Sequence, residues 1–82
     1  MYFTYILYSS RIGKYYTGQT VDLINRLEEH NRGKTPFMKA GIPWQLVYSK
    51  EFQNRGDAIN LEKYIKKRGA GRYLDDIKGQ TG

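Results

Sequence analysis

The chain begins with residues typical of a β-strand. Residues 2–8 are mostly aromatic or β-branched and contain neither glycine nor proline, which predicts a strand rather than a helix. Turn-forming residues follow over 9–13, and residues 14–17 return to the β-type composition before Gly18. Together these segments predict a β-hairpin.

After the hairpin, the hydrophobic spacing changes to that of a helix. Leu23, Ile24 and Leu27 recur at helical spacing, and Gly33 is a typical stop. We therefore expect a helix over about 21–32.

The remaining pattern predicts one more strand and two more helices. Residues 34–43 contain two prolines and a glycine, which predicts a loop with room for one helical turn. A strand is expected over 44–49, a helix between Asn54 and Gly69, and a short helix over 72–78.

This order, β-β-α-β-α with a short final helix, predicts an α/β fold of the α+β kind. We expect a small three-stranded mixed sheet, largely antiparallel, flanked by helices. A chain of 82 residues buries only about 60% of its unfolded surface, so we expect a single domain over residues 1–78 and no Rossmann or barrel enzyme. Residues 79–82 are expected to form a disordered tail.

The composition narrows the partners and excludes several chemistries. Fourteen Lys and Arg residues against eight Asp and Glu give a net charge of +6, which favours a polyanionic partner, above all nucleic acid. The absence of cysteine excludes disulfides, thiolate zinc sites and a cysteine nucleophile. No apolar stretch has the length of a signal peptide or a membrane span, so we expect a cytoplasmic protein without a membrane partner.

Three polar residues lie beside the apolar stripes of the predicted helices. At about 100° per residue, Arg26 and His30 fall one turn apart beside the buried side of the first helix, and Glu62 points with the apolar residues of the second. Each has an ordinary explanation as a boundary side chain, with Glu62 paired to Lys66 one turn on. The alternative is that these side chains form a functional site at the edge of the sheet.

The predicted hairpin adds two tyrosines to this group. If its turn contains an even number of residues, Tyr5 and Tyr16 point to the same face. Arginine, histidine, tyrosine and a carboxylate together fit phosphodiester hydrolysis, which needs a group that positions water and a cation for the phosphoryl oxygens. One carboxylate is also enough for Mg²⁺, which keeps most of its waters.

The spacing of these residues is similar to a known pattern. The ordered set consists of Tyr5, the tripeptide Tyr16-Thr17-Gly18, Arg26, His30 and Glu62. Over about residues 1–68 the chain resembles the GIY-YIG nuclease family, most closely its small stand-alone bacterial members. Those members are related to the catalytic domains of the excision-repair endonuclease subunit and of homing endonucleases.

The resemblance implies hydrolysis of nucleic-acid phosphodiester bonds with one divalent ion, Mg²⁺ or Mn²⁺, in each site. Glu62 would hold the ion, and Arg26 would bind and stabilise the scissile phosphate. Tyr16 or Tyr5 would activate or orient the attacking water, and His30 fills a further catalytic position of the family.

Other positions follow the family's pattern only in part. Gly18 would let the backbone approach its neighbour closely, as the glycine of the second motif does in the family. Phe3-Thr4 stands where the first motif has Gly-Ile, and Thr17 replaces the central apolar residue of the second. Many members carry an asparagine near the end of the domain, whereas none follows Asn60 here.

Basic residues near these motifs are candidates for contacts with the nucleic-acid backbone. They are Arg32, Lys34 and Lys39 around the proline-containing loop, and Lys63, Lys66, Lys67 and Arg68 on the second predicted helix. The ordinary explanation of such residues is a solvated surface.

We therefore expect a metal-dependent endonuclease that acts on DNA, for example in repair, although the same motifs fit RNA. A chain of 82 residues has little surface for reading sequence, so we expect low intrinsic specificity. A protein partner, a dimer or DNA shape would then supply selectivity. The alternative is a noncatalytic nucleic-acid-binding module with the same fold.

Overall fold

Strand β1 (Tyr2–Ser9) is the central strand of a three-stranded sheet. In the computed structural model, which describes residues 1–80, β2 (Lys14–Thr20) and β3 (Gln45–Phe52) pair with it on either side. The expected three-stranded sheet is confirmed, and it is antiparallel throughout rather than mixed. Both outer strands extend further than the hydrophobic pattern predicts, because their last residues still pair with the first residues of β1.

The β1–β2 hairpin brings two tyrosines to one face of the sheet. Residues 10–13 separate the strands, and this even number gives a register in which Tyr5 pairs with Gly18 and Leu7 pairs with Tyr16. Because side chains alternate along a strand, Tyr5 and Tyr16 share a face, as expected.

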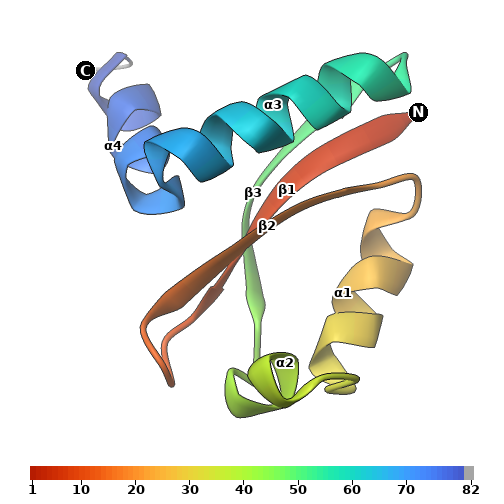
Figure 1. The fold of residues 1–82 in the computed structure, drawn as a ribbon, viewed down its shortest axis with the longest axis vertical. Helices are drawn as coiled ribbons and strands as arrows, with labels where there is room; N and C mark the ends of the chain where they lie inside the picture. Colours follow the sequence, from red (N-terminus) through yellow and green to blue (C-terminus); the bar gives the residue numbers. More distant parts are fainter. Residues whose placement is uncertain (81–82) are drawn as a thin grey trace.

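Two helices cover each face of the sheet (Figure 1). Helices α1 (Leu23–Asn31) and α2 (Pro36–Ala40) lie on the face of Tyr5, and α3 (Arg55–Arg68) and α4 (Ala70–Gln80) lie on the other. Helix α2 occupies the segment that was expected to be a loop with room for one helical turn. Among the described residues, no helix is long and apolar enough to cross a membrane.

The core on the α1 and α2 face is built around a buried tryptophan. The indole Nε1 of Trp44 donates a hydrogen bond to the Met38 carbonyl at 2.8 Å. The Asn31 side chain accepts a hydrogen bond from the Trp44 backbone N–H at 2.7 Å and donates one to its carbonyl at 3.2 Å. Together with the buried Tyr5 and Leu7, these contacts fix the end of α1 against the start of β3.

The opposite face buries Ile6, Ala58 and Ile65 completely. The buried Thr4 hydroxyl donates a hydrogen bond to the Ala58 carbonyl at 2.7 Å and so joins the central strand to the first turn of α3. Ala58 lies one helical turn before Glu62, so this contact also fixes the part of α3 that carries Glu62.

Helix α4 is longer than the expected 72–78. It begins directly after Gly69, whose φ of 94° favours glycine, and it continues to Gln80. Gly79 and Gln80 are therefore helical, whereas they were expected to begin a disordered tail. The rest of that expected tail, 81–82, lies outside the described residues.

Replacing Thr4 with valine tests the anchor of α3, because valine removes the hydroxyl and keeps the shape. We expect Thr4→Val to lower the free energy of unfolding by about 1 kcal/mol, the usual net value of one hydrogen bond. Urea denaturation followed by circular dichroism measures this change. The matched control is Ser10→Ala in the exposed turn, for which we expect a change within about 0.5 kcal/mol. Equal losses for both variants would show that the Thr4 hydrogen bond does not anchor α3.

Candidate functional site

Tyr5 lies at the centre of the candidate site. It is 1% exposed, and its hydroxyl forms a 2.9 Å hydrogen bond with Nε2 of His30. The ring packs against Gly18 on the neighbouring strand, where a Cβ atom would lie 2.6 Å from the Tyr5 hydroxyl oxygen. Only glycine leaves room for the tyrosine in this position, and this is the close approach expected at Gly18.

Tyr5, Tyr16 and His30 form a cluster of three rings from β1, β2 and α1. The ring centroids lie 6.4 Å apart for the two tyrosines. The centroid of His30 lies 6.0 Å from that of Tyr5 and 4.7 Å from that of Tyr16. The side chain of Asp22 caps α1 by accepting a hydrogen bond from the Asn25 N–H, and the helix then carries His30 to the sheet. The structure therefore brings together three residues of the ordered set.

Charged side chains from two helices act on the Tyr5 phenol. Burial raises the pKa of Tyr5 above its ordinary value, and the neighbouring Tyr16 adds to the rise. The positive charge of Arg26 on α1 lowers this pKa, and the negative charge of Glu62 on α3 raises it. Both charges therefore lie within interaction range of one phenol, which is protonated at neutral pH.

His30 is a neutral imidazole at neutral pH. Burial lowers the pKa of His30 below its ordinary value, and the positive charge of Arg26 lowers it further. The negative charge of Glu29 raises this pKa, but by less than the other two effects lower it. A neutral imidazole has one N–H and one lone pair. The hydrogen bond with Tyr5 uses Nε2. If Nε2 donates in this bond, Nδ1 is the acceptor, and if Nε2 accepts, Nδ1 is the donor.

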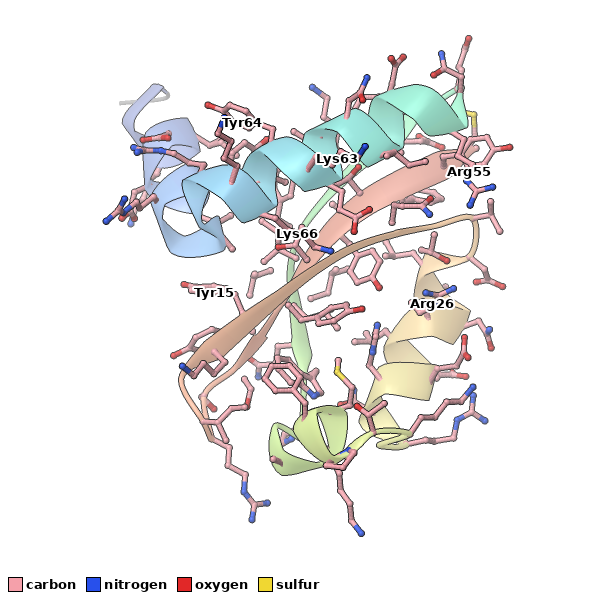
Figure 2. All side chains as sticks on the ribbon, viewed as in Figure 1. Tyr15, Arg26, Arg55, Lys63, Tyr64 and Lys66 are labelled. Atoms are coloured by element: carbon pink, nitrogen blue, oxygen red, sulfur yellow. The ribbon has the colours of Figure 1, made fainter. Side chains whose placement is uncertain are left out.

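The structure shows the ion pair expected of Glu62, and the functional role of this residue stays a prediction. Its side chain is 20% exposed, and its Oε2 accepts a 2.8 Å hydrogen bond from Lys66 Nζ, the ion pair expected one turn along the helix. Its charge also reaches Tyr5. Lys66 lines a cavity with Tyr15 and Tyr16, and Figure 2 shows it on the side of α3 that faces the sheet. Lys66 thus lies beside the candidate site.

The donor set at Glu62 fits a divalent ion that keeps most of its waters. Within residues 1–80, no three or more His, Cys, Asp or Glu side chains are grouped to hold a metal, so Glu62 is a single donor. Its carboxylate already faces one cation, the Lys66 ammonium, in a part-exposed position. Such a carboxylate suits Mg²⁺ or Mn²⁺, which take their other ligands from water and from substrate phosphate.

A cavity of about 470 Å³ opens beside these side chains. Tyr16, Arg26, His30 and Lys34 contribute to its walls. Arg26 Nε lies 3.6 Å from Oε1 of Glu29, whose Oε2 accepts a 2.8 Å hydrogen bond from Lys34. The cavity therefore offers a guanidinium, a phenol and an imidazole to one bound group of the size of a phosphodiester.

The basic residues predicted to contact a nucleic-acid backbone do not form one surface. Lys34 and Lys66 line cavities at the site, whereas Lys67 and Arg68 line a separate cavity at the corner between α3 and α4. Arg68 donates two hydrogen bonds to Asp76, at 2.7 and 2.9 Å. The remaining members, Arg32, Lys39 and Lys63, are exposed.

Arg55 is a cation near the site that the sequence pattern did not reveal. It is the first residue of α3, and it lines a further cavity together with Arg26. At the start of a helix no periodic pattern marks the direction of a side chain, so only the packing of α3 on the sheet places Arg55 beside Arg26.

The single histidine makes stability depend on pH as the pH falls from about 7 toward the folded pKa of His30. The pKa of His30 is lower in the folded protein than its ordinary value of 6.5, so the unfolded chain binds more protons in this interval. We expect the free energy of unfolding to fall as the pH drops through about 6.5 toward the folded pKa. Urea denaturation at a series of pH values measures this fall. His30→Gln has no ring to titrate and should lose the dependence, and a flat wild-type profile would contradict the prediction.

The chain is similar to bacterial proteins named UPF0213. It is 44% identical over 54 residues to the UPF0213 protein of Pediococcus pentosaceus, covering 65% of this chain and 57% of that protein. It is 42% identical over 66 residues to UPF0213 protein YsiG of Lactococcus lactis, covering 79% of this chain and 62% of that protein. It is 33% identical over 79 residues to a UPF0213 protein of Bacillus licheniformis, covering 92% of this chain and 80% of that protein. The chain thus spans less than two thirds of the Pediococcus and Lactococcus proteins.

A comparison with protein-family models identifies the kind of domain. A comparison with solved structures finds no significant match. The model of the GIY-YIG catalytic domain matches residues 1–73. The matched region contains the whole sheet, helices α1 to α3 and every residue of the ordered set, which confirms the resemblance inferred from the motifs. The chain therefore belongs to the GIY-YIG family, whose fold is a nuclease fold.

Proposed function

We propose that the chain is a divalent-metal-dependent endonuclease that hydrolyses phosphodiester bonds of DNA. The observation that carries the proposal is that side chains from β2, α1 and α3 pack around or act on one phenol, that of Tyr5 on β1. Tyr16 and His30 pack around Tyr5, and the charges of Arg26 and Glu62 both act on it. A cation, a carboxylate and a group that positions water are what this hydrolysis requires.

In this proposal Arg26 binds the scissile phosphate. Its guanidinium lines the 470 Å³ cavity, and its side chain remains 42% exposed, with a 3.6 Å contact to Glu29. It would donate charge-assisted hydrogen bonds to the nonbridging oxygens. The same bonds would stabilise the additional negative charge that develops as water attacks the phosphorus.

Tyr16 orients the attacking water, and His30 receives its proton as the new P–O bond forms. The P–O bond to the leaving oxygen breaks, and that oxygen takes up a proton from solvent. Tyr5 is not the base, because burial raises its pKa and keeps it protonated at neutral pH. Its hydroxyl instead holds Nε2 of His30 at 2.9 Å. In the tautomer that donates Nε2–H to Tyr5, Nδ1 of the neutral imidazole carries the lone pair that accepts the proton.

Glu62 is the residue that would hold Mg²⁺ or Mn²⁺. When bound there, the ion supplies Lewis-acid stabilisation of the phosphoryl oxygens. Lys66, 2.8 Å from Oε2, is close enough to the carboxylate to contact the same substrate strand.

We propose that the chain recognises DNA by its backbone and shape rather than by its sequence, as a module in repair or related processes. The cations of the site are suited to phosphates, which carry no sequence information. Selectivity would then come from DNA shape, from a second protein or from segments present in the longer relatives.

One observation favours a second candidate, a noncatalytic nucleic-acid-binding module. The Glu62 carboxylate is already paired with Lys66, so a metal ion has to compete with an ammonium group for it. Both candidates predict binding that weakens as salt rises. They differ in whether a divalent ion brings about cleavage.

Substitution of Glu62 by glutamine distinguishes the two candidates. In Mg²⁺ or Mn²⁺ we expect wild type to nick supercoiled DNA, and Glu62→Gln to reduce the rate about 100-fold or more, because the metal ligand is lost. Gel electrophoresis of the plasmid measures nicking, and fluorescence anisotropy shows that binding is retained. The matched control is Glu51→Gln on the exposed side of β3, which should leave nicking unchanged. Wild type that binds DNA but leaves it intact in both metals would establish the noncatalytic candidate.

Addition of one methyl group at Gly18 tests whether the position of Tyr5 supports activity. A Cβ atom there would lie 2.6 Å from the Tyr5 hydroxyl oxygen and 2.8 Å from Cζ, so the ring has to move. We expect Gly18→Ala to lower the free energy of unfolding by about 1–3 kcal/mol and to reduce nicking at a temperature where the variant is folded.

Gly79→Ala is the control for this substitution, because a Cβ atom at that glycine meets nothing within 4 Å. Combination of Gly18→Ala with Tyr5→Phe removes the closest contact and should recover part of the lost stability. Additive losses in the double variant would show that the two residues do not constrain each other.

A further inference from the structure

A second cavity, of about 330 Å³, adjoins the cavity that holds Tyr16 and His30. It lies where the start of β1, the end of β2 and the start of α3 meet. Its lining residues are Tyr2, Gln19, Thr20, Val21, Arg26 and Arg55. Because Arg26 lines both cavities, they are adjacent at its side chain. Figure 2 shows Arg55 on α3 and Arg26 on α1 approaching this region from two sides.

The charged side chains that line this cavity are both arginines, and no carboxylate lines it. Arg55 is exposed and forms no ion pair within the described part of the chain. In the adjoining cavity, by contrast, Arg26 and Lys34 both contact Glu29. Two guanidinium groups that line one cavity without a carboxylate are suited to a phosphate group.

A third cavity, of about 300 Å³, continues on the other side of the site. It shares Tyr16 and Phe37 with the central cavity, and Lys66 lines it. The first and third cavities lie toward opposite ends of β2, because the first includes residues 19–20 and the third includes residues 15–17. The central cavity shares Arg26 with the first and Tyr16 with the third, and so links them. Together the three cavities offer space for more than the reacting phosphate.

We propose that the cavity lined by Arg55 and Arg26, the Arg55 subsite, binds the substrate phosphate next to the scissile one. This rests on the proposed function. The substrate strand runs along β2 from Arg55, past Arg26 and Tyr16, toward Lys66. Arg55 holds the neighbouring phosphate, and the ring of Tyr2 offers a surface for the sugar or base attached to it.

Substitution of Arg55 by glutamine tests the subsite with two measurements. Without divalent metal, binding of a fluorescent DNA oligonucleotide is followed over a series of salt concentrations. We expect the slope of the logarithm of the binding constant against the logarithm of salt concentration to become less negative by about one in Arg55→Gln, because one phosphate contact is lost. With metal, we expect the apparent KM for nicking to rise about 5- to 10-fold while kcat stays within about twofold, because Arg55 binds away from the reacting bond.

Two further variants separate the subsite from general charge. Arg55→Lys restores the charge and should restore the salt slope, and Arg11→Gln removes one charge from the exposed hairpin turn, which lines none of the three cavities. An effect of Arg11→Gln equal to that of Arg55→Gln would overturn the subsite, and so would an unchanged slope and KM for Arg55→Gln. In both results the proposed function stands if wild type still cleaves. If wild type binds DNA without cleaving it, the proposed function fails, and the salt slopes alone decide whether Arg55 binds phosphate. If wild type does not bind DNA, both proposals fail.

Discussion

The packing of Tyr5 against Gly18 is the constraint on which the rest of the site depends. Because position 18 lacks a side chain, the phenol can lie over the neighbouring strand, and its hydroxyl reaches Nε2 of His30 at 2.9 Å. That hydrogen bond, with the packing of Leu23 and Leu27 on the core, orients α1 so that Arg26, one turn before His30, lies toward the same side. The charge of Glu62 reaches the same phenol from α3. One ring of β1 thereby connects side chains from three other elements, β2, α1 and α3.

Burial of this ring cluster also sets its protonation states. The pKa of Tyr5 is raised and that of His30 is lowered, both chiefly by burial, so both groups are neutral at neutral pH. Because both rings are neutral before the reaction, the cluster holds no buried charge until His30 accepts a proton. The charged groups, Arg26 and Glu62, keep part of their side chains exposed, where a phosphate and a hydrated ion can reach them. Neutral groups inside and charged groups outside are a consistent arrangement for activating water beside a phosphodiester.

Those parts of the fold and site that depend on periodicity could be predicted from the sequence. Counting the residues of the hairpin turn places Tyr5 and Tyr16 on one face, and the helical repeat places Arg26 beside His30. What could not be predicted depends on how separate elements pack. The angle at which α3 crosses the sheet, set by buried contacts far apart in sequence, decides where Arg55 lies.

The ion pairs change the interpretation of the net charge of +6. Three of the predicted backbone contacts are already paired: Lys34 with Glu29, Lys66 with Glu62, and Arg68 with Asp76. Each pair offsets its cation, so these residues attract a polyanion less than their number suggests. At the end of β2, by contrast, Arg55 forms no ion pair within the described residues, and together with Arg26 it lines a cavity that no carboxylate lines. In the proposed function, a strand bound at that end would pass Arg26 and Tyr16 on its way toward Lys66.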